Sequence, residues 1–392
     1  MRNRPYFSPT EGGGDESKAT QLGTPIQLQR SHELDEFLLS LELTGEIPAA
    51  TGTNFTIEPL KEDIQPDQEI SGENGYFIQK APLLKGLPTE DLNTISEAST
   101  LVKIEPEKTL AKKGYYIATQ AAVLSIQRNG TDVNAHFTVK PGAGVGEFAA
   151  IGLGRTATLK LTGQVSTDFV FIPEEDLKKL SIISQNILLE NAIRASQHLA
   201  NTNKWIEENT RLATILKSGK VEFTPPTAQP STIDPVFREF GGETEPLIEN
   251  QKIESREGNI TLNIDPNGGI VRIETYEEQV LALLPNQTFM GEFSALGMPK
   301  TAEMVAQPGE GQHQMLIMHI PIPTPEYPKE RQKALTALAH AVRDKVADAA
   351  EFHMAIEKGL NAILEGNEDN EGSGLTLHEK TGGIFTLAGE EL

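Results

Sequence analysis

One short segment rich in small residues carries the side chains best suited to bind an anion. Residues 146–157 read GEFAAIGLGRTA. A phosphate group needs backbone N–H groups at a short helix N-terminus and one fixed cation, and small residues let the backbone come close to it. The fork of an Arg such as Arg155 can bind two oxygens of an anion at once, and Glu147 places a carboxylate in the same segment. The candidate binding residues are Gly146, Glu147, Phe148, Ala149, Ala150, Arg155 and Thr156.

The same segment recurs in the second half of the chain. Residues 291–302 read GEFSALGMPKTA, and seven of the twelve positions match 146–157 without a gap. This match indicates that one module was duplicated. In the second copy Lys300 stands where the first has Arg155, and a Lys offers a point charge without a fork. The weaker second site consists of Gly291, Glu292, Lys300 and Thr301.

The segments around both copies are typical of short strands separated by turns. Runs of β-branched and aromatic residues predict strands at 115–118, 123–127, 135–139, 156–161 and 169–172, and again at 260–264, 270–274, 280–284 and 315–320. Asn129-Gly130 is a hairpin signal. A long helix is predicted after each set, from about 174 to 217 and from about 329 to 364. We therefore expect a mainly β protein with helices, made of two jelly-roll-type β-barrel modules, each followed by a long helix.

Composition shifts divide the chain into five parts. The composition of residues 1–75 predicts a flexible, disordered N-terminal arm. Its amphipathic segment 32–43 is either a docking peptide or a helix that packs on the folded modules. The first module with its helix spans 76–218, and a Pro-rich linker follows at 219–240. The second module with its helix spans 241–366. The acidic tail, 367–392, could form a hairpin about Gly382-Gly383.

Four segments in order around the first copy resemble the cyclic nucleotide-binding domain family. LLKGLPTEDLNTI (83–95) is similar to its opening helix, and IEPEKTLAKKGYYI (104–117) to the strands that follow, with a shortened loop. VKPGAGVGEFAAIG (139–152) is similar to the turn and phosphate-binding cassette, and FVFIPEEDLKKL (169–180) to the closing strand and hinge helix. The second copy resembles the family mainly over 280–320 and is degenerate.

The resemblance implies roles for the candidate residues. Glu147 would hold the ribose 2′-hydroxyl and Arg155 the cyclic phosphate of cAMP or cGMP, and Thr156 matches a position that favours guanine in cGMP-selective members. Seven residues separate Glu147 from Arg155, fewer than in typical members, and one residue spans about 3.3–3.6 Å of chain. The trimmed loop could therefore move the guanidinium away from the phosphate.

Composition excludes several other functions. The chain has 392 residues, 34 Lys and Arg against 56 Asp and Glu, and no Cys. A net charge of −22 argues against nucleic-acid binding, and no apolar run is long enough to span a membrane. No secretory signal is recognised, so we expect a cytoplasmic protein. No catalytic constellation or metal-ligand cluster stands out, so no cofactor and no enzymatic activity are expected.

Two functions fit these observations. The first is a non-enzymatic regulatory protein that binds a cyclic nucleotide and signals to a separate protein partner. The alternative is a structural or scaffolding subunit of a larger assembly whose modules have lost ligand binding. A heptad-like stripe on the helix 177–217 packs on its own domain or mediates an oligomer.

Overall fold

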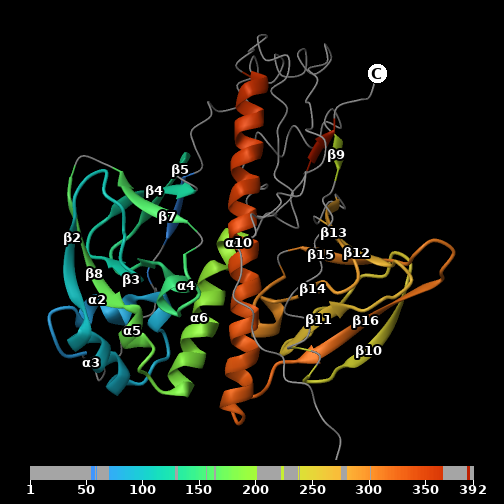
Figure 1. Cartoon of the computed structure of the whole chain (residues 1–392), viewed down its shortest axis with the longest axis horizontal. Helices are drawn as coiled ribbons and strands as arrows, with labels where there is room; N and C mark the ends of the chain where they lie inside the picture. The colour runs from blue at the N-terminus through green and yellow to red at the C-terminus, as the bar shows by residue number, and fades with distance from the viewer. Residues whose placement is uncertain are drawn as a thin grey trace, which may run out of the picture.

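The computed structural model places two β-rich modules on either side of a pair of long helices (Figure 1). It describes residues 54–57, 59, 70–128, 131–155, 157–162, 165–200, 222–224, 237, 239–274, 280–300, 302–364 and 386–388. The predicted segments 32–43, 129–130, 201–217 and 382–383 lie outside this part of the chain, as do Thr156 and Thr301.

The first module contains two four-stranded sheets. One sheet has the order β1-β5-β4-β7 and consists of β1 (Asn54–Ile57), β5 (Thr131–Val139), β4 (Ala122–Arg128) and β7 (Thr158–Thr162). The other has the order β2-β8-β3-β6 and consists of β2 (Thr100–Ile104), β8 (Thr167–Pro173), β3 (Gly114–Ala118) and β6 (Gly144–Val145). β1 pairs with β5 in parallel, and it lies within the segment predicted as the N-terminal arm.

Alternation along β3 explains how this module is layered. Because successive side chains of a strand point to opposite faces, Tyr116 packs between the two sheets while Tyr115 and Ile117 pack on the helices. β8 behaves in the same way, with Phe171 between the sheets. Both strands are therefore buried on both faces.

The helices of the first module cover the outer face of the β3 sheet. They are α2 (Gly75–Lys80), the 3-10 helix η1 (Pro82–Leu84), α3 (Thr89–Ala98), α4 (Glu147–Ala150), α5 (Glu174–Leu177) and α6 (Ile182–Ala200). The helix predicted to run unbroken from about residue 174 is interrupted between α5 and α6. Two hydrogen bonds explain the break, because the Gln185 amide donates to the carbonyls of Lys178 and Leu180 at 2.9 and 2.8 Å. The Ser181 hydroxyl then accepts from the Ser184 N–H at 3.2 Å and caps α6.

The second module repeats the arrangement with fewer strands. One sheet has the order β10-β16-β11-β14 and consists of β10 (Glu243–Ile248), β16 (Gln314–Pro321), β11 (Asn259–Asn263) and β14 (Phe289–Met290). The other has the order β13-β12-β15 and consists of β13 (Val280–Leu284), β12 (Ile270–Glu274) and β15 (Glu303–Gln307). The 3-10 helix η2 (Ser294–Leu296) follows β14, and α10 (Pro328–Leu364) follows the last strand of the module.

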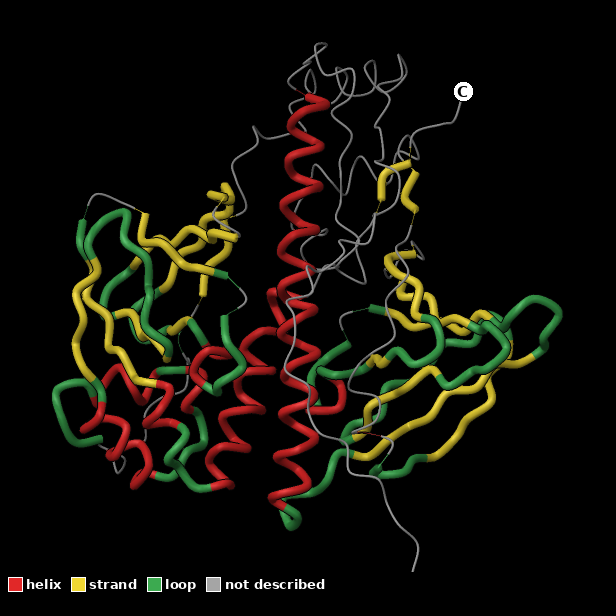
Figure 2. Tube along the Cα trace, viewed as in Figure 1, coloured by secondary structure: helices red, strands yellow, loops and turns green. Residues whose placement is uncertain are grey.

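Both modules are open sandwiches. In the described residues no strand of one sheet pairs with a strand of the facing sheet, so the predicted mainly β fold is confirmed but its barrels are not closed. Figure 2 shows the two sets of strands separated by helices. Each pair of sheets instead encloses its own apolar core, centred on Tyr116 and Phe171 in the first module and on Val271 and Ile317 in the second.

The helices α6 and α10 pack on each other and join the modules. Leu189 and Ile193 of α6 lie in one apolar cluster with Leu335, Leu338 and Val342 of α10. Polar contacts close the edge of this interface: Arg331 donates to Glu190 at 2.6 Å, Gln332 to Gln185 at 2.7 Å, and Asn186 to the carbonyl of Pro328 at 2.9 Å. Nothing in the sequence pattern predicted this pairing of two helices about 140 residues apart.

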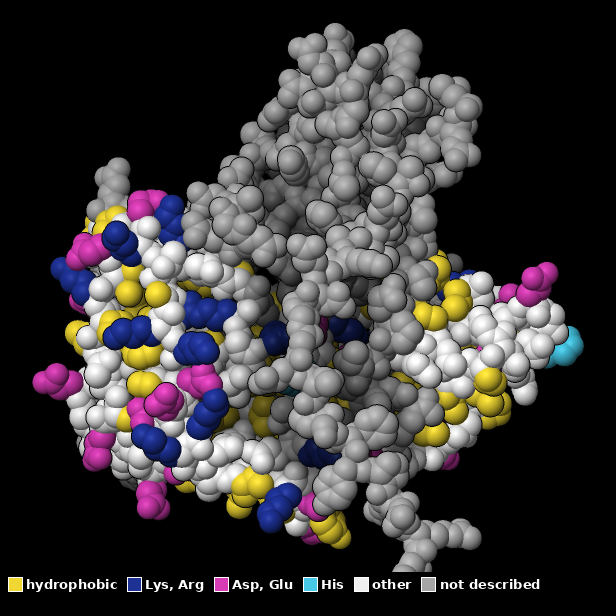
Figure 3. All heavy atoms as spheres, in the orientation of Figure 1, with side chains coloured by type: hydrophobic (Ala, Val, Ile, Leu, Met, Phe, Trp, Pro, Cys, Tyr) yellow, Lys and Arg dark blue, Asp and Glu magenta, His cyan; other side chains and the backbone are white. Residues whose placement is uncertain are grey.

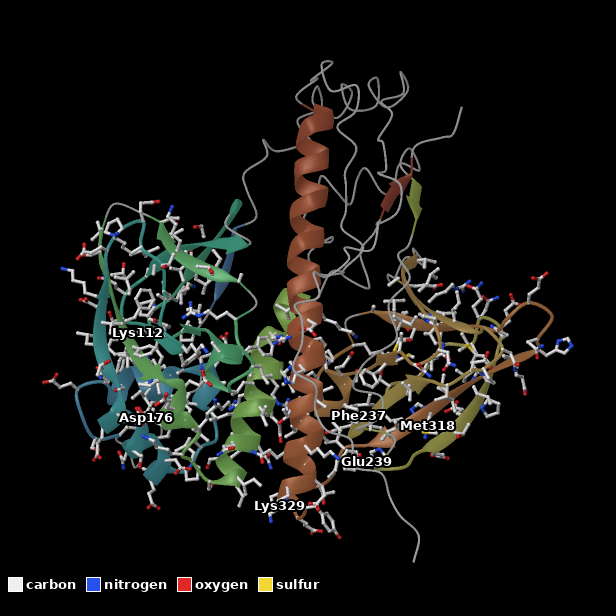
Figure 4. All side chains as sticks on the ribbon, in the orientation of Figure 1. Lys112, Asp176, Phe237, Glu239, Met318 and Lys329 are labelled. Atoms are coloured by element: carbon white, nitrogen blue, oxygen red, sulfur yellow. The ribbon has the colours of Figure 1, made fainter. Side chains whose placement is uncertain are left out.

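The predicted linker and tail also contribute structure. Phe237, within 219–240, is fully buried and packs edge-on against Phe289 at 5.4 Å between ring centroids. Figure 4 shows it next to α10. Residues of the linker and the tail pair in a small sheet, β9 (Glu222–Thr224) with β17 (Thr386–Ala388). Among the helices that the structure describes, none is both long and apolar enough to cross a membrane.

Candidate functional site

The first cassette, residues 146–155, begins with a sharp turn that only glycine fits. Gly146 has a φ of 94°, and a Cβ atom there would lie 2.7 Å from the carbonyl oxygen of Gly114. The turn starts α4, in which the N–H of Ala150 donates to the carbonyl of Gly146 at 2.8 Å. The backbone of α4 therefore packs closely on β3, as the small residues of the sequence predicted.

Glu147 places a carboxyl group in the first turn of α4. Desolvation raises the pKa of this carboxyl to about 7, and the nearby backbone N–H groups of Gly146 and Glu147 lower it only in part. No ion pair to Glu147 occurs within the described residues. Glu147 is therefore half-buried, with no cation beside its carboxyl group in the part of the chain that the structure describes.

Tyr115 adds a second buried polar group. Its side chain is fully buried, its hydroxyl has no hydrogen bond of good geometry within the described residues, and a backbone contact to Leu83 lowers its pKa in part. Desolvation raises the pKa of Tyr115 well above its ordinary value, and the charge of Glu147 raises it further. Sequence reasoning did not select Tyr115, because a tyrosine in a strand is indistinguishable from a core residue.

Arg155 is the cation of the first cassette, and it is held in place by main-chain carbonyls. Its Nη1 donates to the carbonyl of Leu110 and its Nη2 to that of Lys112. The guanidinium lies 5.6 Å from the ring centroid of Tyr116, within reach of a cation–π interaction. Its Nε–H is buried and has no partner. The shortened loop at 110–113, which the sequence showed, supplies the two carbonyls.

The apolar residues of the cassette are buried. Phe148, Ala149 and Ala150 are at most 6% exposed, and Phe148 belongs to the cluster that α6 and α10 share. These three side chains therefore fix the position of the cassette backbone, and their role as binding residues stays a prediction.

The second cassette, residues 291–300, has a different electrostatic arrangement. Gly291 keeps the positive φ, at 81°, but the buried Glu292 is ion-paired with Lys345 of α10. The Lys300 ammonium lies 3.5 Å from a carboxylate oxygen of the exposed Glu254. Sequence comparison of the two copies could not find Lys345, because it lies on a helix outside the repeat. The charges of Glu292 and Lys300 are therefore both paired within the chain, and the second site stays a prediction.

Net charge is distributed unevenly along the chain. Residues 76–200 contain 13 Lys and Arg against 12 Asp and Glu, a net charge of +1, whereas the chain as a whole carries −22. Figure 3 shows basic side chains interspersed with acidic ones over the visible face of the first module. Figure 4 places Lys112 among them, and its ammonium lies 5.5 Å from the ring centroid of Phe171. The first module therefore does not repel an anion as the composition of the whole chain would suggest.

Metal ligands do not gather in the described part of the chain. No group of three or more His, Asp or Glu side chains there is placed to hold a metal ion.

Comparison with known proteins gives remote structural likenesses only. No protein-family model matches the chain, and no curated protein matches it. The regulatory domain of Toxoplasma gondii PKA, in complex with cAMP, is 15% identical with a TM-score of 0.26, covering 74% of this chain and 99% of that chain.

Two further solved structures show the same level of likeness. The regulatory subunit of a cAMP-independent protein kinase A from Trypanosoma brucei is 14% identical with a TM-score of 0.26, covering 68% of this chain and 86% of that chain. A cyclic nucleotide-binding-like protein from Brucella abortus is 17% identical with a TM-score of 0.22, covering 26% and 93%. At these identities and TM-scores, a function has to be supported by the residues of this chain.

Proposed function

We propose that the first cassette binds a cyclic nucleotide and that the chain is a non-enzymatic regulatory protein acting on a separate protein partner. One observation supports this most strongly: the polar groups of the first cassette remain incompletely partnered, whereas those of the second are ion-paired. The Nε–H of Arg155 is buried without a hydrogen bond, the Tyr115 hydroxyl has only a backbone contact to Leu83, and Glu147 has no cation in the described residues. A buried polar group without a well-formed hydrogen bond calls for an explanation, and a bound ligand would supply one here.

The chemistry of each group matches one part of such a ligand. Arg155 has five N–H donors, of which two bind carbonyls, so its Nε–H and two others could bind a phosphate. Glu147, once ionised, could accept from a ribose hydroxyl. Backbone N–H groups at the start of α4 would complete the phosphate contacts, as the resemblance implies. The proposed ligand is therefore cAMP or cGMP.

Occupation of the cassette would be transmitted through Phe148. Its side chain lies in one apolar cluster with Leu189 and Ile193 of α6 and with residues of α10. A ligand that draws α4 toward the phosphate would therefore alter the packing of both helices, which are the natural route to a protein partner. Whether the predicted oligomer forms through 177–217 depends on residues beyond 200.

Binding is best tested by thermal shift and calorimetry on the full chain with cAMP and with cGMP. A nucleotide present at 100 times its Kd should stabilise the wild type by about 2.7 kcal/mol. Arg155→Lys removes the fork and should weaken binding at least about 10-fold, since each tenfold costs about 1.4 kcal/mol. Lys300→Ala is the matched control in the second cassette and should bind as the wild type does.

Three outcomes would contradict the proposal. The first is the absence of a shift with either nucleotide at millimolar concentration. The second is an Arg155→Lys variant, folded by circular dichroism, that binds as tightly as the wild type. The third is loss of binding in the Lys300→Ala control.

A scaffolding role is the second candidate function, and the pairing of charges in the second cassette favours it. Glu292 is neutralised by Lys345 within the chain, and the fork of Arg155 is occupied by two carbonyls. If neither nucleotide binds, the two modules would serve as packing units of a larger protein assembly.

A further inference from the structure

One turn of α10 contacts both cassettes. The Nη1 of Arg343 donates to the carbonyl of Leu153 in the first cassette at 2.5 Å. Two residues later, Lys345 pairs with Glu292 of the second. Side chains two residues apart on an α-helix point about 200° apart around its axis. Arg343 and Lys345 can therefore contact groups on nearly opposite sides of α10. Figure 1 shows α10 running between the two modules.

The contact to the first cassette falls on the segment that leads to Arg155. Leu153 lies between Gly152 and Gly154, whose φ values are 86° and 79°. Its N–H donates to the carbonyl of Phe148 at 2.9 Å, and its side chain packs on the shared apolar cluster. With a glycine on each side, the bond from Arg343 to the Leu153 carbonyl adds a restraint, beyond the Phe148 hydrogen bond and the apolar packing, on the direction of the chain entering Arg155.

The neighbouring Asp344 orients the Arg343 side chain toward the Leu153 carbonyl. The Oδ1 of Asp344 accepts from its Nε at 2.9 Å and from its Nη2 at 2.6 Å. One edge of the guanidinium is thereby held by a single carboxylate oxygen, and Nη1 is left for Leu153. The side chain of Arg343 is only 27% exposed, which limits the alternative orientations that it can adopt.

The contact to the second cassette fixes the position of the helix. The side chain of Glu292 is 5% exposed, and a carboxylate so deeply buried is stable only with a cation beside it. Lys345 is that cation. A rotation of α10 about its axis, or a slide along it, that moved Arg343 away from Leu153 would also displace Lys345 from Glu292.

We propose that Arg343 is a positioning residue for the first cassette, and that the Glu292–Lys345 pair anchors α10 so that Arg343 can act. In this arrangement the second cassette no longer recruits a ligand of its own. Instead, its Glu292 anchors α10, the helix whose Arg343 restrains the chain segment that leads to Arg155. The effect on ligand affinity rests on the proposed function, whereas the effect on the conformation of the first cassette does not.

Hydrogen exchange of the ligand-free full chain tests the positioning directly. Arg343→Met keeps the length of the side chain and removes its donors. Amides of residues 151–155 should then exchange about 5-fold faster, which corresponds to one hydrogen bond worth about 1 kcal/mol. Arg343→Lys restores one donor and should recover part of the protection. Lys345→Met should speed exchange in both cassettes.

Lys333→Met is the matched control, because Lys333 lies on the same helix and forms an exposed ion pair with Glu239 at 2.5 Å. It should leave exchange in both cassettes unchanged. The proposal is overturned if Arg343→Met leaves residues 151–155 as protected as in the wild type. It is also overturned if Lys345→Met affects only residues 291–300.

The ligand test is added to the same four variants. If the wild type binds cAMP or cGMP, Arg343→Met and Lys345→Met should weaken that binding about 3- to 10-fold, and Lys333→Met should not. Unchanged affinity in both variants would overturn the proposed effect on the site. If the wild type binds neither nucleotide, the proposed function fails, and the exchange data still decide whether Arg343 positions the cassette.

Discussion

The two cassettes begin with the same three residues, Gly-Glu-Phe, and differ in what neutralises the glutamate. Glu147 lies in a desolvated turn without a cation in the described residues, and its pKa is raised to about 7. Glu292 is more deeply buried and pairs with Lys345. The local sequence places a carboxyl group at the start of each cassette, but the charge brought by a distant helix decides whether that group remains available.

The cations of the two cassettes also differ in how completely they are partnered within the chain. Arg155 binds carbonyls of its own module and keeps an unpartnered Nε–H, while Lys300 reaches the exposed carboxylate of Glu254. Two similar segments can thus keep a similar backbone turn while their charged side chains find different partners inside the chain.

The largest effect should come from the core that both cassettes share. Phe148→Ala removes an aromatic side chain that is 6% exposed, and such truncations cost about 3–5 kcal/mol of the free energy of unfolding. Phe293→Ala, in the second cassette, should cost about as much because both rings lie in one cluster. Urea unfolding followed by circular dichroism measures both. Val165→Ala is the control. Because Val165 is 71% exposed, this substitution should change the free energy of unfolding little.

A loss below about 1 kcal/mol for Phe148→Ala would mean that the first cassette is not anchored in the shared core.

Next in size is the pH dependence due to Glu147. Its pKa is higher in the folded chain than in the unfolded chain, about 7 against 4.5, so the folded state binds more protons between these values. The contribution of Glu147 to stability is therefore present below about pH 4.5 and is lost as the pH rises through about 7. Glu147→Gln should remove this loss and raise the free energy of unfolding by about 2 kcal/mol at pH 8.

Glu292→Gln is the matched substitution in the second cassette and should have the opposite sign. It removes the charge that pairs with Lys345 and should destabilise the chain by about 1–2 kcal/mol at pH 8. Equal signs for the two variants in thermal unfolding would contradict the electrostatic contrast between the cassettes.

A smaller loss is expected for Arg155→Lys in the absence of ligand. A lysine can reach one of the two carbonyls, of Leu110 or Lys112, but it cannot bind both as the guanidinium does. The free energy of unfolding should fall by about 1 kcal/mol in urea titrations. A stability equal to that of the wild type would show that the carbonyl contacts contribute nothing.

The smallest effect should be that of Lys300→Met. Its ion pair with Glu254 has a separation of 3.5 Å, and Glu254 is 82% exposed, so solvent screens the attraction. The change in stability should stay below about 0.5 kcal/mol at any salt concentration. A larger loss would mean that Lys300 has a role in the second cassette that the ion pair does not explain.

Much of the fold could be predicted from local patterns. The runs of β-branched and aromatic residues gave β3, β4, β8, β11 and β12 nearly at their observed bounds, because a pleated strand buried on one or both faces requires that alternation. The break between α5 and α6 was missed, since it depends on the side-chain amide of Gln185 capping two carbonyls. The two jelly-roll-type β modules were predicted, but the order of strands in their open sheets was not, because strand pairing is a non-local choice.

The sequence by itself determined where the two cassettes lie, that they came from one duplicated segment, and which charged side chains each contains. These properties depend on residue type and spacing over a dozen positions. Only the tertiary structure decided that Lys345 neutralises Glu292, that carbonyls of Leu110 and Lys112 hold Arg155, and that α10 contacts both cassettes. Electrostatic and packing energies depend on distance in space, and helices far apart in the chain become neighbours only when their apolar faces are buried together.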